Sequence, residues 1–404
     1  MKHIIILGDG MADEPCRELE GKTPIEAAYT PALDELARRG RNGLLATVPE
    51  GYAPGSEIAH LSLLGYHLPD VFEGRGTLEA ASMGIDIEPG EIAMRCNLIC
   101  IDADGSIKNH SAGHISSEEA SELIDELNRQ LGDGRGSFYP GVSYRHLLKV
   151  KNGDKRITCV PPHDVPGHLA ANEMIRADVP EAEETAEYIN SLIIRSQELL
   201  RNHPVNLTRI AEGKDPANSI WPWSPGYKPR MKTMAELFGI KDGYVISAVD
   251  LIMGIGVYAG LKPITVEGAT GLYNTNYEGK LQAALQALKK GADFVFLHIE
   301  ASDEAGHEGD ALLKKKTVEY LDRRIVGPLL KSLDDFDEDV AVALLPDHPT
   351  PCNIRTHSSA PVPFVIWRRD IAPDKVSVYS EKAAMEGGYG VLKNDEFIKE
   401  FLKS

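Results

Sequence analysis

Short apolar runs alternate with amphipathic stretches along most of this chain. Runs such as residues 2–9, 292–300 and 339–346 have the length of buried strands. Helical patterns lie between them, as in residues 30–40, where Thr30 and Pro31 suit a cap followed by a first helical position. Strands that alternate with helices predict an α/β fold, with a doubly wound, mostly parallel sheet and helices on both faces.

The pattern assigns elements to most of the sequence. The predicted strands are residues 2–9, 92–102, 143–151, 244–250, 292–300, 339–346 and 361–369. The predicted helices are residues 30–40, 116–132, 181–203, 232–240 and 310–333. Residues 217–229, ANSIWPWSPGYKP, are rich in Pro and Trp and are predicted to form a loop.

The length of 404 residues favours two or three domains. From residue 92 to residue 180 the α/β rhythm gives way to a mixture of strands, one long helix and a Gly-rich turn. We therefore expect residues 92–180 to form an inserted α+β cap domain, and residues 1–91 and 181–404 to form a discontinuous core domain.

Composition and charge narrow the class of protein. Hydrophobic residues make up 42% of the chain, charged residues 26%, and no apolar run approaches the length of a membrane span. The N-terminus has no cleavage-site pattern, so we expect a cytoplasmic protein without a membrane partner. The net charge of −18 argues against nucleic acid, although bound cations would still permit a small anionic substrate.

The cysteines give no sign of a cross-linked or zinc-stabilised fold. Five are present, scattered and without a CxxC pair. This spacing argues against a disulfide framework and against a structural zinc site. We expect reduced thiols in the core.

Three groups of ionisable residues lie just beyond predicted strands in the last quarter of the chain: Asp303 with His307, Asp347 with His348, and His357. Taken singly, they have ordinary explanations: a capping Asp with a surface His, a turn between prolines, and a solvated or core His. Their shared placement at strand ends instead indicates a metal site. Mixed carboxylate and imidazole ligands suit Mn²⁺, Zn²⁺ or Co²⁺ better than Ca²⁺.

Two N-terminal residues complete this candidate site. Asp9 follows the first predicted strand, where Asp-Gly is also a common turn. Ser56 lies in a tight turn that leads into a helix, where it would serve equally well as an N-cap. A serine nucleophile needs a base or a metal to activate it, and the metal site would supply one.

At this point the motifs carry a resemblance to a known family. In order along nearly the whole chain they are LGDGMAD, GSEIAHLSLLGY, EGRGTLEAASMGI, IAMRCNLI, GATGLYNTNYEGK, DEAGHEGD, PDHPTP and RTHSSAPVPF. They resemble the archaeal-type cofactor-independent phosphoglycerate mutases of the alkaline phosphatase superfamily. The resemblance implies an alkaline-phosphatase-like core with an inserted cap, acting in glycolysis and gluconeogenesis without bisphosphoglycerate.

The resemblance also implies a two-metal centre. Asp9, Ser56, Asp347 and His348 would hold one divalent ion, and Asp303, His307 and His357 the other. We expect Mn²⁺, with Zn²⁺, Co²⁺ and Mg²⁺ as alternatives. Ser56 would take the phosphoryl group of 3-phosphoglycerate as a phosphoserine and return it to the 2-hydroxyl of the bound glycerate.

A mutase must hold glycerate between the two transfers, and a cap supplies the means. Within family-like motifs, Arg75, Arg95, His163 and Lys280 are the candidates for binding the phosphoglycerate, although each is by composition an ordinary surface charge. The sequence gives no indication of the oligomeric state.

The chain departs from the family pattern twice. Asn109, His110 and His114 of NHSAGH stand where an arginine-rich stretch is expected, and Trp221 and Trp223 stand where an arginine-glycine segment is usual. These departures keep a homoserine-kinase-like phosphotransferase open as an alternative. A plain phosphomonoesterase and a non-catalytic metal-binding or regulatory protein also stay open.

Overall fold

The computed structural model describes residues 1–403, which fall into two units. The first comprises Met1–Phe72 and Arg230–Ser404, and the second comprises Glu73–Pro229. The chain thus has a discontinuous unit interrupted by an inserted one, but the insert begins earlier and ends later than residues 92–180.

An eight-stranded sheet lies at the centre of the first unit. Its strands are β1 (Lys2–Gly8), β2 (Arg41–Ala46), β10 (Gly243–Ile246), β11 (Lys262–Ile264), β12 (Phe294–Ile299), β13 (Val340–Leu345), β14 (Val362–Trp367) and β15 (Val391–Lys393). The order is β11-β10-β12-β1-β13-β14-β2-β15. Only β14 runs antiparallel to its neighbours in this sheet, so the mostly parallel sheet is confirmed.

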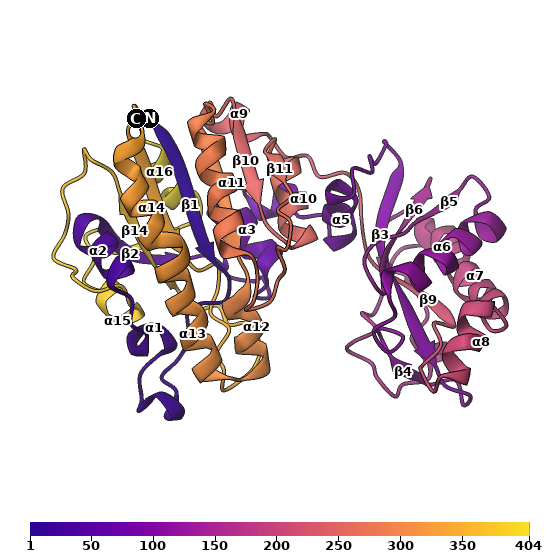
Figure 1. The fold of residues 1–404 in the computed structure, drawn as a ribbon. Helices are drawn as coiled ribbons and strands as arrows, with labels where there is room; N and C mark the ends of the chain where they lie inside the picture. Colours follow the sequence, from indigo (N-terminus) through magenta and orange to yellow (C-terminus); the bar gives the residue numbers. More distant parts are fainter. Residues whose placement is uncertain (404) are drawn as a thin grey trace. The chain divides into compact units, whose positions relative to one another are not determined.

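Helices cover both faces of this sheet. They are α1 (Pro24–Ala27), α2 (Pro31–Arg39), α3 (Ser56–Leu63), α4 (Leu68–Val71), α9 (Met234–Phe238), α10 (Asp250–Tyr258), α11 (Tyr277–Lys289), α12 (Ala301–Glu308), α13 (Ala311–Leu321), α14 (Gly327–Ser332), α15 (Glu381–Ala384) and α16 (Glu396–Leu402). Ile4 and Ile6 of β1 share a core cluster with residues of α2, α11, α13 and α14. The intervening His3 points to the other face, where its ring contacts Phe401 of α16. Figure 1 shows α11, α13 and α14 in front of the strands and α16 behind them.

The second unit is an α+β structure. Its strands are β3 (Glu91–Ile101), β4 (Ile107–Asn109), β5 (Gly136–Tyr139), β6 (Arg145–Lys151), β7 (Ile157–Thr158), β8 (Arg176–Ala177) and β9 (Ser219–Gly226). Its helices are α5 (Arg75–Ser82), α6 (Ser117–Leu131), α7 (Glu183–Leu200) and α8 (Pro204–Ala211). Five strands form one antiparallel sheet, and residues of α6 and α7 share its hydrophobic core with residues of β3.

The Pro- and Trp-rich segment predicted as a loop is a strand. Residues Ser219–Gly226 form β9 and pair with β3, with a shift of register between Ala93 and Arg95. Because β9 lies at the edge of the sheet, its prolines remove no hydrogen bond to a second neighbour. The loop prediction was therefore wrong, since the edge position tolerates residues that usually exclude a strand.

The packing of α5, α7 and β9 explains the wider bounds of the inserted unit. Helix α5 packs on β3 and β9, and α7 packs on β9. Residues before 92 and after 180 thus bury their apolar side chains in this unit, and their helical pattern alone does not show which sheet they cover. Across residues 1–403, no helix is both long and apolar enough to cross a membrane.

Candidate metal centre

The seven candidate metal ligands all belong to the first unit, and most follow directly from strand ends. Asp9 comes after β1, while Asp347 and His348 come after β13. Asp303 and His307 lie on α12, which begins just after β12. The neighbouring parallel strands β12, β1 and β13 end at one edge of the sheet, so their following residues converge there.

The first cluster joins Asp9, Asp347, His348 and Ser56. Ligand atoms of Asp9, Asp347 and His348 lie within 4.8 Å of one another, and all three residues are buried. Nε2 of His348 lies 3.2 Å from Oγ of Ser56 and 3.2 Å from Oδ2 of Asp347. The N-cap of α3 is Gly55, and the Ser56 hydroxyl forms its hydrogen bond with His348. The serine hydroxyl is therefore turned toward the cluster instead of the helix backbone.

The second cluster joins Asp303, His307 and His357. Ligand atoms of Asp303, His357 and His348 lie within 4.8 Å of one another, so His348 adjoins both clusters. Nε2 of His307 lies 3.2 Å from Oδ2 of Asp303 and 3.0 Å from Nε2 of His357. The structure thus brings together every residue that the sequence nominated as a metal ligand.

The first cluster has more negative charge than its protein neighbours neutralise. Burial, together with the nearby Asp347 carboxylate, raises the pKa of Asp9 well above its usual range. Oδ1 of Asp9 and Oδ2 of Asp347 are buried and accept no hydrogen bond from the described residues. Two buried carboxylates with unused oxygens fit a bound cation, which would take the place of a shared proton.

The second cluster also fits a cation. Nδ1 of His307 lies 3.1 Å from the carbonyl oxygen of Arg355, which accepts only, so Nδ1 carries a proton. Nε2 faces Asp303 and His357. Its hydrogen bond with Asp303 raises the pKa of His307 to about 9, so without an ion Nε2 also holds a proton, which a cation would replace. Hydrogen bonds from His307 and His357 hold the pKa of Asp303 well below its usual range, although burial opposes this.

Thr350 fixes which nitrogen of His348 faces the serine. Its hydroxyl donates to Oδ1 of Asp303, so its oxygen is free to accept from Nδ1–H of His348 at 3.3 Å. Burial lowers the pKa of His348, which favours the neutral ring. The lone pair of Nε2 is therefore directed at Ser56.

Two buried histidines that the sequence analysis missed support the centre. Nε2 of His298 lies 2.8 Å from Oδ2 of Asp9, and its Nδ1 lies 2.9 Å from Oγ of Ser247. Nδ1 of His60 lies 2.8 Å from the carbonyl oxygen of Ser56 and 3.5 Å from Oδ2 of Asp347. Both orient groups of the centre. The available signals were a histidine inside the apolar run FVFLHI and a histidine four residues after Ser56.

The raised pKa of His307 predicts how the metal-free protein responds to pH. Its pKa rises from 6.5 to about 9, so its contribution to stability is complete below 6.5 and is lost as pH rises through about 9. We expect wild-type protein in chelator to melt above the His307→Gln variant near pH 6, with the difference vanishing near pH 10. A difference in melting temperature that stays constant across this range contradicts the assignment.

Three of the candidate substrate-binding residues belong to the second unit. The guanidinium of Arg95 lies 5.1 Å from the ring centroid of Trp223, and the His163 ring lies 5.4 Å from it. Nη1 of Arg95 is also 2.9 Å from Oε1 of Glu79. Burial lowers the pKa of His163, and the charges of Arg95 and Arg75 lower it further. Arg95 and His163 therefore meet at the Trp223 ring, where the His163 ring is neutral and the charge of Arg95 is paired with Glu79.

The fourth candidate, Lys280, lies elsewhere. It belongs to α11 in the first unit, is fully buried, and donates to the carbonyl oxygen of His298 at 3.2 Å. Burial lowers its pKa to about 8, while Glu300 acts in the opposite direction. Lys280 thus neighbours β12, the strand that leads into Asp303.

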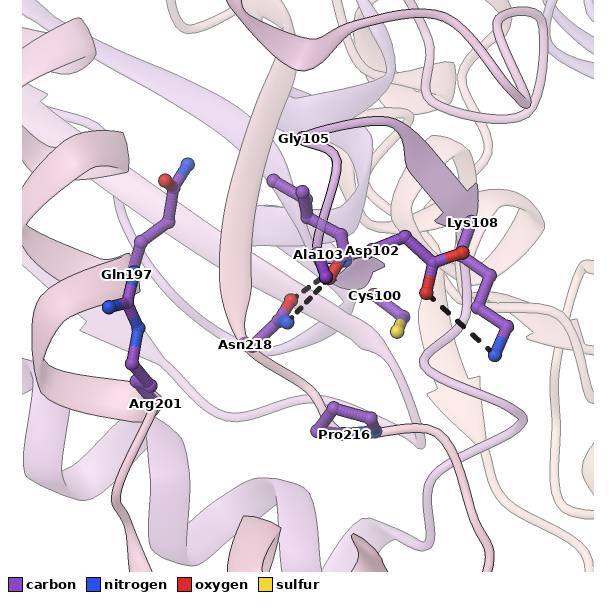
Figure 2. Close-up of a pocket in the computed structure, with 10 residues that line it drawn as sticks. Cys100, Asp102, Ala103, Gly105, Lys108, Gln197, Arg201, Pro216 and Asn218 are labelled. Atoms are coloured by element: carbon purple, nitrogen blue, oxygen red, sulfur yellow. Dashed lines mark hydrogen bonds and ion pairs between the residues drawn. The ribbon is translucent and has the colours of Figure 1, made fainter.

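The second unit contains a cavity of about 590 Å³, and Figure 2 shows residues that line it. Lys108 and Arg201 line it, together with Asn218, whose amide bonds the backbone of Ile101 at 2.8 Å and 2.7 Å. None of the candidate ligands or substrate-binding residues lines this cavity. It is therefore separate from the centre described above.

Comparisons with known proteins agree with these motifs. The family model described as 2,3-bisphosphoglycerate-independent phosphoglycerate mutase matches residues 37–206. A protein of that name from Methanosarcina acetivorans is 48% identical, with 100% of both chains covered. A probable member from Geobacter sulfurreducens is also 48% identical, with 96% of each chain covered.

Solved structures extend the comparison. A protein from Pyrococcus horikoshii has a TM-score of 0.84 and 30% identity over 99% of this chain and 96% of its own. The cofactor-independent phosphoglycerate mutase from Thermoplasma acidophilum has a TM-score of 0.67 and 28% identity over 97% of this chain and 96% of its own. This chain belongs to the family of 2,3-bisphosphoglycerate-independent phosphoglycerate mutases.

Proposed function

We propose that this protein interconverts 3-phosphoglycerate and 2-phosphoglycerate through a phosphoserine at Ser56, with two divalent ions and without bisphosphoglycerate. The observation that carries the proposal is the position of the Ser56 hydroxyl. It lies 3.2 Å from Nε2 of His348, inside a buried cluster of carboxylates and imidazoles. A serine in such surroundings is poised to become a nucleophile.

The residues present fit two cations. Asp9, Ser56, Asp347 and His348 would hold one ion, because this cluster contains unused carboxylate oxygens. Asp303, His307 and His357 would hold the other, because one carboxylate and two imidazole nitrogens meet there. We propose Mn²⁺, with Zn²⁺, Co²⁺ and Mg²⁺ as alternatives. When bound, the ions would lower the pKa of the serine hydroxyl and offset phosphate charge.

The chain's own residues position the reacting atoms. Nδ1–H of His348 is held by Thr350, so Nε2 faces the Ser56 hydroxyl and is the nitrogen that would bind the ion beside it. Helix α3 begins at Ser56, so its first backbone N–H groups favour a phosphate beside this residue. His298 holds the Asp9 carboxylate through a bond of 2.8 Å.

The transfer is two displacements at phosphorus. Oγ of Ser56 gives up its proton and forms the new P–O bond as the bond to the 3-oxygen of glycerate breaks, and that oxygen takes up a proton. The 2-hydroxyl of the same glycerate then gives up its proton and attacks the phosphoserine, and the released serine oxygen takes up a proton. The net change is an isomerisation, and it requires glycerate to remain bound between the steps.

Positive side chains supply that retention. We propose that Arg75, Arg95, His163 and Lys280 bind the phosphoglycerate. The clustering of Arg95 and His163 around Trp223 supports this role. The resemblance implies an arginine-glycine segment where Trp223 stands, so Arg95 would provide the cationic contact there, with the His163 ring beside it.

A ³¹P NMR time course tests the function. Mn²⁺-loaded protein with 3-phosphoglycerate, and without bisphosphoglycerate or any other phosphoryl donor, is expected to produce 2-phosphoglycerate to equilibrium. The same preparation treated with a chelator is expected to lose this activity, and added Mn²⁺ to restore it.

Different products would identify a different function. Release of inorganic phosphate would indicate a phosphomonoesterase that fails to retain glycerate. Unchanged substrate, with homoserine-dependent product once a phosphoryl donor is added, would indicate the kinase-like phosphotransferase. Either result would contradict the proposed mutase.

A further inference from the structure

A third cluster of ligand-type side chains lies outside the centre described above. It contains Asp13, Cys16 and Cys352, all buried, with ligand atoms within 4.8 Å of one another. Asp13 and Cys16 follow β1, and Cys352 follows β13. The two cysteines are far apart in the sequence, so no CxxC pattern reveals them.

The separations suit a small thiophilic ion. Sγ of Cys16 lies 3.7 Å from Oδ1 of Asp13. A tetrahedral zinc with sulfur at about 2.3 Å and oxygen at about 2.0 Å places these two atoms about 3.5 Å apart. Sγ of Cys352 completes a set of three ligands, which leaves a fourth position for water.

The charges also balance. Nζ of Lys314 is fully buried and lies 2.7 Å from Oδ2 of Asp13, with further bonds to the carbonyl oxygens of Ala12 at 3.0 Å and Thr350 at 2.8 Å. It therefore engages the carboxylate oxygen that does not face Cys16. A divalent ion, two thiolates, one carboxylate and one ammonium sum to zero charge, which a buried site favours.

We propose that Asp13, Cys16 and Cys352 bind a thiophilic divalent ion such as Zn²⁺, at a site separate from the two catalytic ions. Without the ion the two thiols stay protonated, because burial raises the pKa of Cys16 to about 11 and that of Cys352 to about 12. Binding replaces both protons with the ion, and two protons are released.

This site would join the two segments that carry catalytic ligands. Thr350 N–H donates to the carbonyl oxygen of Ala12 at 3.2 Å, and Met11 and Ala12 form isolated bridges to Pro349. Asp9 lies just before this junction on one segment, and Asp347 and His348 just before it on the other. Cys16 and Cys352 follow this junction, so an ion bound by both would link the two segments on the side opposite to the catalytic ligands.

Cobalt spectroscopy tests the site, because thiolate-to-cobalt charge transfer absorbs in the near ultraviolet and the catalytic centre contains no sulfur ligand. Full-length protein kept reduced with a phosphine is titrated with Co²⁺. We expect the thiolate band in wild-type protein and in the control Cys159→Ser, and its loss in Cys16→Ser and in Cys352→Ser. Absence of the band from wild-type protein, or its persistence in both variants, overturns the proposal.

A second measurement avoids any dependence on how the variants fold. Wild-type protein is alkylated with and without Zn²⁺, and modification is mapped by mass spectrometry. Zn²⁺ is expected to slow alkylation of Cys16 and Cys352 but not of Cys159. Alkylation rates of Cys16 and Cys352 that are the same with and without Zn²⁺ overturn the proposal. Neither readout depends on mutase activity, so failure of this site and failure of the proposed function are distinguishable.

Discussion

Ser56→Ala is expected to abolish mutase activity, lowering turnover by at least about 10⁴-fold, as loss of a nucleophile does in other covalent mechanisms. The substitution removes the oxygen that lies 3.2 Å from Nε2 of His348, and with it the only proposed acceptor of the phosphoryl group. Turnover of 3-phosphoglycerate, measured with saturating Mn²⁺, checks this expectation.

Ser62→Ala is the matched control, because Ser62 lies in the last turn of the same helix α3. It is expected to keep turnover close to that of wild type. Metal content after desalting shows whether Ser56→Ala still binds its ions through the remaining ligands. A fully metal-loaded Ser56→Ala enzyme with near wild-type turnover would rule out the phosphoserine route.

Lys314→Met is expected to lower the free energy of unfolding by about 3–5 kcal/mol, the usual effect of leaving a buried charge without its partner. The side chains of Lys314 and Asp13 are both fully buried, and their charged atoms are 2.7 Å apart. Methionine retains most of the volume and removes the charge, so the Asp13 carboxylate loses its neutralising ammonium. Urea unfolding in the presence of a chelator measures the change without a contribution from bound metal.

The neighbouring Lys315 provides the control. It pairs with Glu319 at 3.3 Å, with about a third of each side chain exposed, so Lys315→Met is expected to cost less than about 1 kcal/mol. Combining Lys314→Met with Asp13→Asn is expected to recover part of the stability, because no isolated charge remains. Equal effects of Lys314→Met and Lys315→Met would contradict the importance of the buried pair.

The strand ends explain why so much of the centre was predictable. Asp9, Asp303 and Asp347 each follow an apolar run, and parallel strands bring such positions to one edge. The same reasoning predicted the mostly parallel sheet and the helices on both of its faces. In each case the local sequence pattern, an apolar run of strand length or an amphipathic helix, was enough to predict where the residues lie in the fold.

Other features depend on contacts that no local pattern encodes. Strand β9 is stable because β3 pairs with it, and its prolines had suggested a loop. The bounds of the inserted unit follow from α5 and α7 packing on its sheet. Thr350 and His298 act through partners distant in sequence, at Asp303 and Asp9.

The cysteines illustrate the same limit. Their spacing in the sequence argued against a metal site, yet the fold brings Cys16 and Cys352 to one carboxylate. The two segments meet because β1 and β13 are neighbours in the sheet, and their following residues continue side by side. Only the strand order reveals this, and strand order is not readable from cysteine spacing.

Mapping the phosphorylated residue during turnover tests the central claim most directly. Mn²⁺-loaded wild-type protein is mixed with 3-phosphoglycerate, quenched rapidly in acid, digested, and analysed by mass spectrometry. We predict one phosphoryl group on the peptide that contains Ser56, located on Ser56 itself and absent when the metal is removed. Phosphate on another residue, or turnover without any phosphorylated peptide, would contradict the account.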